Sequence, residues 1–266
     1  MLLAWIIYAA LGLVAGVLAG LLGVGGGIVI VPMLSIAFEL QGLPSHYIQH
    51  MALGTSLGTI MFTSISSFRA HHKHGAVNWS VVRRVTLGIL VGTLAGSWLA
   101  AQLSTRFLKG FFAVFLFYVA TQMILNFKPK ASRHLPGMAG MSGVGGVIGV
   151  VSSLVGIGGG TLSVPFMVWC NMTMHNAVGT SAAIGFPIAV AGAVGYLING
   201  LKVSADLPPM SLGFLYIPAL VGIAATSILT APLGASIAHK LPVAKLKRVF
   251  AVLLYVMGAR MVWTLL

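Results

Sequence analysis

The stretch LLGVGGGIVIVP occupies residues 21–32, and a closely similar stretch, LVGIGGGTLSVP, occupies residues 154–165. Each places four glycines within five residues and follows them with an apolar run that contains a proline. So dense a group of glycines interrupts a helix, because glycine loses more conformational entropy in a helix than any other residue. The two copies predict two breaks in the chain, each followed by a new helix.

The chain around these breaks is too apolar for a water-soluble domain. It is 58% hydrophobic and 6% charged, whereas soluble domains carry about a quarter charged residues. We therefore expect an all-α, polytopic membrane protein with about ten apolar segments. Two of them, 26–40 and 159–171, are shorter than the roughly 20 residues of a spanning helix, which favours half-helices or re-entrant pieces. The other segments are 2–22, 47–68, 82–103, 107–126, 137–155, 176–198, 211–237 and 247–266.

The similarity of the two copies extends beyond the glycines. HMALGTS (50–56) matches HNAVGTS (175–181), and LKGFFAVFL (108–116) matches LKRVFAVLL (246–254). This predicts a first membrane repeat over 1–127, a basic cytoplasmic linker over 128–136 and a second membrane repeat over 137–266. Five segments per repeat is an odd number, so the second repeat is expected to enter the membrane inverted.

The charges are strongly unbalanced, with 15 Lys and Arg against 2 acidic residues and a formal net charge of +13. The basic residues gather in the loops 69–84 and 239–248 and in the linker, which ten crossings would place on one side. Cytoplasmic loops of membrane proteins collect Lys and Arg, so that side is expected to be the cytoplasm. This accounts for the basicity, and nothing in the pattern indicates nucleic acid as a partner.

Broken backbone is tolerated in lipid only where it is buried in protein or lines a polar cavity. A helix that starts at such a break directs free N–H groups and its positive dipole end at that cavity. The GTS hydroxyls and the two repeated histidines could add donors, although the glycines could equally serve tight packing or a sharp turn. We expect a shared site for a small anion, without a metal or cofactor. The candidate substrate-binding residues are Gly25, Gly26, Gly27, His50, Thr55, Ser56, Gly158, Gly159, Gly160, His175, Thr180 and Ser181.

Other motifs support different classes more weakly. GTSLG (54–58) fits the G-x-S-x-G pattern of hydrolases, but the second copy reads GTSAA, so an enzyme is not expected. HHKH (71–74) supplies three imidazoles, which suit nickel or cobalt, and divalent-metal transport is the alternative function. The two acidic residues, Glu39 and Asp206, lie near predicted segment ends, which argues against a carboxylate proton relay.

Two copies of GGG-x-x-x-V-P, each followed by A-x-G-T-S, resemble the sulfite exporter TauE/SafE family, as does HHKHGAVNW (71–79). The resemblance covers both halves of the chain. It implies a multi-pass transporter, typically an exporter, of small anions such as sulfite or organosulfonates in the bacterial inner membrane. The expected mechanism is alternating access around a midplane site, one half rocking against the other. The expected partners are a small anion and the lipid bilayer, and a homo-oligomer is left open.

Overall fold

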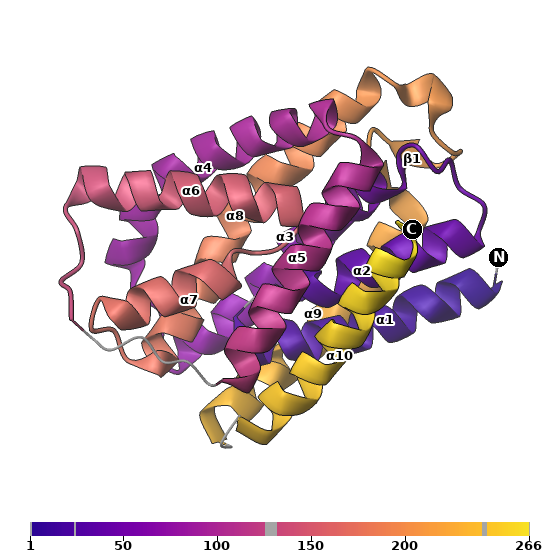
Figure 1. Cartoon of the computed structure of the whole chain (residues 1–266). Coiled ribbons are helices and arrows are strands. Elements are labelled where there is room, and N and C mark those ends of the chain that lie inside the picture. Colours follow the sequence, from indigo (N-terminus) through magenta and orange to yellow (C-terminus); the bar gives the residue numbers. More distant parts are fainter. Residues whose placement is uncertain (1, 24, 126–131, 241–243, 266) are drawn as a thin grey trace.

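The computed structural model describes residues 2–23, 25–125, 132–240 and 244–265, and in these parts it contains ten α-helices (Figure 1). Seven of these helices are long and apolar enough to cross a membrane, so the prediction of an all-α, polytopic membrane protein is confirmed. The helices are α1 (Leu2–Leu22), α2 (Gly27–Leu40), α3 (Ile48–Lys73), α4 (Trp79–Gln102), α5 (Thr105–Ile124), α6 (Met138–Val155), α7 (Gly160–Trp169), α8 (Met174–Leu201), α9 (Ile217–Lys240) and α10 (Ala244–Trp263). A short 3₁₀ helix, η1 (Ser204–Asp206), and a hairpin of β1 (Ser211–Leu212) and β2 (Leu215–Tyr216) precede α9.

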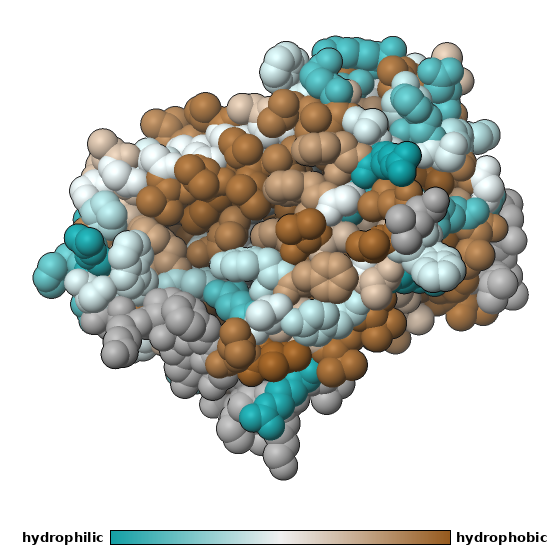
Figure 2. Space-filling view, viewed as in Figure 1, coloured by the Kyte–Doolittle hydropathy of each residue, from teal (hydrophilic) through white to brown (hydrophobic). Residues whose placement is uncertain are grey.

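The surface carries the large apolar side chains that a lipid environment requires. In Figure 2, hydrophobic residues cover the middle of the visible face, and hydrophilic residues gather toward its margins. Exposed apolar side chains occur on most of the long helices, and Leu87, Trp98, Val114, Val147 and Leu229 are examples. Because lipid tails solvate such side chains as well as a protein core does, these positions mark the lipid-facing surface.

The first two helices form a hairpin whose tip is the glycine break. Gln41, which follows α2, donates a hydrogen bond of 2.8 Å to the Tyr8 hydroxyl near the start of α1. Helix α2 therefore returns toward the side from which α1 entered. With 14 residues it is about 21 Å long, too short for a hydrocarbon core of about 30 Å.

Helices α6 and α7 form a second hairpin of the same kind. The Ser132 and Arg133 N–H groups, at the end of the predicted linker, donate to the Trp169 carbonyl at the end of α7, at 3.2 and 3.3 Å. Helix α7 has 10 residues and is only about 15 Å long. A hairpin leaves the chain on the side of the membrane from which it entered, as two full crossings would. The side expected for each basic loop is therefore the same as with ten crossings.

Helices α3 and α8 are the most buried of the long helices and run antiparallel through the centre. Their close approaches pair Ser64 with Gly185 and Leu57 with Gly192, so one helix ascends as the other descends. The other long contacts join the two halves of the chain as well: α1 packs on α9, α4 on α6, and α5 on α10. The halves are therefore interleaved and do not form separate domains.

The packing of α1 on α9 repeats that of α6 on α4 in the same register. A Cβ on Gly12 would lie 2.4 Å from the Ile223 carbonyl oxygen, and a Cβ on Gly145 would lie 2.4 Å from the Val85 carbonyl oxygen. Inverted repeats require this kind of matched pairing. The repeat boundaries stay a prediction, since residues 128–131 of the linker lie outside the described residues.

The glycines of α6 permit a matched test of this packing. Gly145→Ala should lower stability by about 1–3 kcal/mol, because the added methyl group would collide with the α4 main chain. Gly143→Ala, two residues away, should leave stability unchanged or raise it by up to about 1 kcal/mol, because Gly143 is exposed and a Cβ there meets no atom within 4 Å. Thermal melting of the detergent-purified variants measures both. Equal melting temperatures would show that α4 and α6 do not pack this closely.

Candidate functional site

The tips of the two hairpins owe their shape to glycine. Gly26 (φ 79°) and Gly159 (φ 76°) are left-handed N-cap residues of α2 and α7, and neither helix has a side-chain cap. Residues with a Cβ rarely adopt this conformation. A Cβ on Gly26 would also lie 2.7 Å from the Ala15 carbonyl oxygen. A substitution there would therefore disturb folding, and its effect on binding could not be separated from that disturbance.

The two tips meet at the centre of the molecule. A Cβ on Gly25 would lie 3.4 Å from the Gly158 Cα, and a Cβ on Gly27 would lie 2.2 Å from the Gly156 carbonyl oxygen. Ile60, in the middle of α3, packs against both Gly25 and Gly27. The structure thus brings the two glycine clusters together and buries them, and their role in binding an anion stays a prediction.

One serine from the opposite half of the chain donates a hydrogen bond to each tip. Ser56 Oγ on α3 donates a hydrogen bond of 2.8 Å to the Gly156 carbonyl, and Ser181 Oγ on α8 donates one of 2.9 Å to the Gly23 carbonyl. A serine hydroxyl has a single proton to donate. In this conformation both protons are directed to the main chain of the tips.

The neighbouring threonines position the helix that follows in the other half. Thr55 Oγ1 accepts a 2.9 Å hydrogen bond from the N–H of Tyr216, the residue before α9. Thr180 Oγ1 accepts a 2.9 Å hydrogen bond from the N–H of Asn78, the N-cap of α4. The GTS motif is therefore part of the contact between halves in both copies.

The structure does not bring His50 and His175 to the tips. Each lies six residues before the serine of its motif, roughly 9 Å along the helix axis. His50 is buried, and its Nε2 lies 3.1 and 3.0 Å from the carbonyl oxygens of Ala100 and Leu103, so it joins α3 to the end of α4. His175 is exposed at the start of α8.

The three histidines of HHKH point to different surroundings. His71 is buried and its Nε2 lies 2.8 Å from the Gly20 carbonyl oxygen, whereas His72 Nδ1 accepts from Trp79 Nε1 at 3.3 Å. His74 lines a separate cavity. Within the described parts of the chain, no three His, Cys, Asp or Glu side chains are grouped as metal ligands, so the geometry gives the nickel or cobalt alternative no assembled site.

Both acidic side chains lie away from the tips, as their sequence positions indicated. Glu39, one residue before the end of α2, forms an ion pair with Lys109 of α5. Asp206 is exposed in η1, within the loop before α9. Neither carboxylate can therefore serve the tips as a counter-charge.

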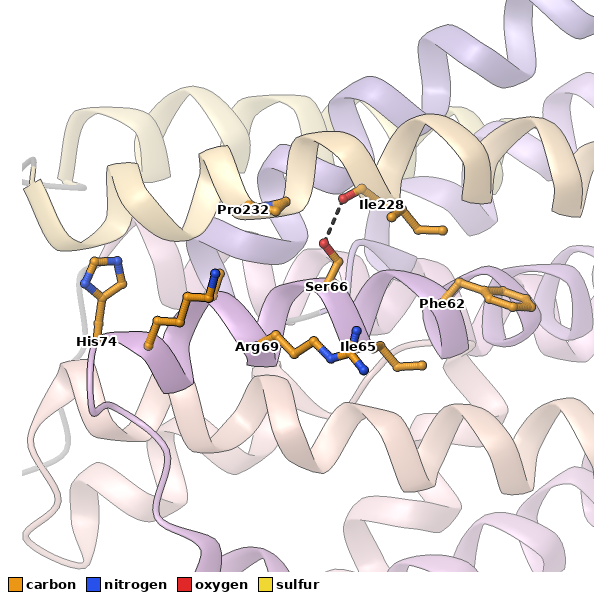
Figure 3. Close-up of a pocket in the computed structure, with 9 residues that line it drawn as sticks. Phe62, Ile65, Ser66, Arg69, His74, Ile228 and Pro232 are labelled. Atoms are coloured by element: carbon orange, nitrogen blue, oxygen red, sulfur yellow. Dashed lines mark hydrogen bonds between the residues drawn. The ribbon is translucent and has the colours of Figure 1, made fainter.

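A basic cavity that sequence analysis missed lies between α3 and α9 (Figure 3). Its volume is about 500 Å³, and its lining contains Arg69, Lys73 and His74 but no acidic residue. Ser66 Oγ bridges the two helices by donating to the Ile228 carbonyl at 2.7 Å. The spacing of Arg69 and Lys73 on one helix face was a visible signal, but the α9 wall was not.

This cavity lies on the face of α3 that points away from the tips. Its lining residues on α3 run from Phe62 through Ser66 and Arg69 to Lys73. On a helix with about 3.6 residues per turn, these positions lie opposite Ile60, which contacts the tips. The cavity and the tips are two different places in the molecule.

Three buried hydroxyls near the second tip were also missed. The side chains of Thr93, Ser152 and Thr161 have no hydrogen-bond partner among the residues that the structure describes. The repeated motifs give no signal for two of them, because Ser152 and Thr161 occupy positions at which the two copies differ.

Fold and site together define a multi-pass helical membrane protein in which two re-entrant hairpins meet tip to tip. The family model described as "Sulfite exporter TauE/SafE" matches residues 8–261. The chain therefore belongs to the sulfite exporter TauE/SafE family, and it is a membrane transporter.

Relatives across bacteria and archaea are named in the same general terms. A "Probable membrane transporter protein" of Haemophilus influenzae is 37% identical, over 94% of this chain and 95% of the relative. Probable membrane transporter proteins of Methanocaldococcus jannaschii and Bacillus subtilis (YunE) are each 28% identical; the alignments cover 93% and 98% of this chain, and 91% and 98% of the relatives. No solved structure matches this chain significantly.

The serine contacts yield a stability prediction. Ser181→Ala leaves the Gly23 carbonyl without its donor and should lower the free energy of unfolding by about 1–3 kcal/mol. Ser97→Ala is the matched control, because buried Ser97 donates only to Leu94 in its own helix, at 2.9 Å, and should cost less than about 1 kcal/mol. Denaturant or thermal unfolding in detergent compares the two. Similar losses would mean that the contact with the tip adds no stability.

Proposed function

We propose that this transporter exports small sulfur oxyanions, sulfite or organosulfonates, across the bacterial inner membrane by alternating access. The observation that carries the proposal is the meeting of two helix N-termini, those of α2 and α7, at the buried tips. The family to which the chain belongs supports the direction and the substrate class.

Two such helix ends favour a negative solute. Each helix N-terminus is equivalent to roughly half a positive elementary charge, and the first N–H groups of a helix have no acceptor within it. Together the ends of α2 and α7 contribute roughly one positive charge, which the negative C-terminal ends of α1 and α6 at the same breaks partly offset. The described residues of the tips supply this charge without a Lys or Arg side chain. Since Glu39 and Asp206 both lie elsewhere, no carboxylate opposes an anion there.

In this proposal, the interleaved packing limits which parts of the molecule can move relative to each other. Helices α1, α3 and α9 pack together and carry α2, while α4, α6 and α8 pack together and carry α7. Each group contains helices from both halves of the sequence, so the expected rocking of one half against the other would break the helix contacts within both groups. We therefore assign the motion to these two mixed groups, which meet along α3 and α8. The contacts from Ser56 to Gly156 and from Ser181 to Gly23 cross that interface and must change as the tips separate.

The basic cavity supports the same sign of charge. Arg69 and Lys73 lie in the last turns of α3, within the basic stretch 69–84 that the positive-inside rule assigns to the cytoplasm. A cationic surface free of acidic residues raises the local concentration of anions and speeds their encounter with the protein. In this proposal the cavity attracts the anion to the cytoplasmic face, and the tips bind it.

Transport by purified protein tests the proposal. Liposomes that contain the protein and are loaded with sulfite should release it faster than protein-free liposomes, and sulfoacetate should compete. Nickel and cobalt flux measured in the same vesicles is the comparison for the alternative function. If these cations cross while sulfite and sulfoacetate do not, the anion proposal fails.

The cavity can be tested with variants of equal net charge. The double change Arg69→Gln and Lys73→Gln should slow sulfite transport from the cytoplasmic face by up to about tenfold at low ionic strength, with a smaller effect in high salt. The control is Arg83→Gln with Arg84→Gln, two exposed charges of α4 that do not line the cavity. Transport rates measured across a salt series would refute this role if both pairs behaved alike.

A further inference from the structure

The two tips are not equivalent in polarity, and we propose that the second tip supplies the side-chain donors of the anion site through Ser152 and Thr161. The ligand class is a small oxyanion, held by these hydroxyls and by the first N–H groups of α7. This inference rests on the proposed function and refines it by assigning the side-chain donors to one repeat.

Thr161 is the second residue of α7, two positions after the N-cap Gly159. It is 7% exposed, and its Oγ1 has no hydrogen-bond partner within the described parts of the chain. The N–H groups of Leu162 and Ser163 bond to the Gly159 carbonyl, whereas those of Gly160 and Thr161 belong to the open end of the helix. An unpartnered hydroxyl and free backbone donors thus occupy the same helix end.

Ser152 adds a second hydroxyl from the helix before the break. It is fully buried, and its Oγ is likewise without a partner among the described residues. A Cβ on Gly159 would lie 3.4 Å from this Oγ, so the Ser152 hydroxyl faces the N-cap of α7. A third hydroxyl of this kind, Thr93, lies against Gly149, one turn before Ser152 on α6.

Buried hydroxyls almost always have a hydrogen-bond partner, because leaving one unpaired is costly. Ser152 and Thr161 therefore indicate a ligand that accepts hydrogen bonds. A sulfur oxyanion has only acceptor oxygens, so it can accept from both hydroxyls and from the backbone of α7 at once. A metal cation could use only the hydroxyl oxygens as ligands, and the N–H groups at the positive end of α7 would oppose it.

The first tip lacks these hydroxyls. When the two glycine clusters are superimposed in sequence, Thr161 corresponds to Ile28 and Ser152 corresponds to Ala19. Both Ile28 and Ala19 are buried, so the first tip offers an anion no hydroxyl at either of these two positions. The glycine cluster occurs in both copies, whereas the hydroxyls of Ser152 and Thr161 occur in the second copy alone. Duplication of the sequence therefore does not explain these two hydroxyls.

The hydroxyls of the GTS motif are not equivalent candidates. Ser181 donates to the Gly23 carbonyl and accepts from Ser163 at 2.9 Å, and Ser56 donates to the Gly156 carbonyl. Their protons hold the tips in place. Ser152 and Thr161 lie beside the same tips with their protons uncommitted.

The experiment measures sulfite binding to the purified full-length protein by thermal stabilisation and by calorimetric titration. Thr161→Val keeps the shape of the side chain and removes the hydroxyl, and it should weaken sulfite affinity at least about tenfold. Ser152→Ala should do the same. Thr161→Ser retains the hydroxyl and should bind as the unchanged protein does, and the matched control Ile28→Val, at the equivalent position of the first tip, should also bind normally.

The unliganded proteins provide a second signature. If the Thr161 hydroxyl lacks a partner until the anion arrives, Thr161→Val should melt no lower than the unchanged protein without sulfite. A lower melting temperature together with normal sulfite affinity would show that the hydroxyl is structural or bound to water, and would overturn the inference.

The outcomes separate this inference from the proposed function. If the unchanged protein binds sulfite and Thr161→Val, Ser152→Ala and Ile28→Val all bind it equally, the hydroxyls are not ligands and the anion function stands. If the unchanged protein binds neither sulfite nor sulfoacetate and transports neither, the proposed function fails and this inference fails with it.

Discussion

The whole structure depends on how broken main chain is satisfied inside a bilayer. A lipid interior has no water to bond to free carbonyl and N–H groups, so each break needs partners from the protein itself. Here the carbonyl of Gly156 accepts a hydrogen bond from the Ser56 hydroxyl, and the carbonyl of Gly23 accepts one from the Ser181 hydroxyl. Each half thus stabilises the break of the other, which gives a physical reason for the motif to occur twice.

The close helix pairs extend this mutual dependence through the fold. Glycines let α1 approach α9 and let α4 approach α6 until main chain contacts main chain. His71 and Tyr196 add matching bonds, to the carbonyls of Gly20 and Ser153, at the ends of α1 and α6. Each repeat therefore buries much of its surface against its copy, and the proposed movement follows the mixed groups of helices.

The sequence alone was sufficient for the features that local chemistry determines. Composition gave the membrane class, and the glycine clusters gave two breaks, each followed by a short helix. The return of α2 toward the start of α1 was left open, because it depends on contacts such as that between Tyr8 and Gln41, which no periodicity encodes. The paired serines and threonines were found as a motif, but their partners in the other half depend on tertiary structure.

The basic cavity and the unpaired hydroxyls could not be predicted for a different reason. Arg69 and Ile228 line one cavity only after α3 packs on α9. Thr161 and Ile28 occupy equivalent positions but differ, so the repeat itself gives no signal there. In a duplicated transporter, shared residues report mainly on how the copies fit together. Positions at which the two copies carry different residues indicate where the two halves have different roles.

The absence of buried cationic side chains from the described residues of the tips suits a carrier, which must release what it binds. A Lys or Arg in a bilayer is costly and would hold an anion strongly through its full charge. Helix ends and hydroxyls supply partial charges that are distributed over several donors. Separation of the tips would move α2 away from α7, so that the donors would be divided between the two mixed groups of helices. The affinity would then fall because the site itself comes apart, with no need for a side chain to change its protonation.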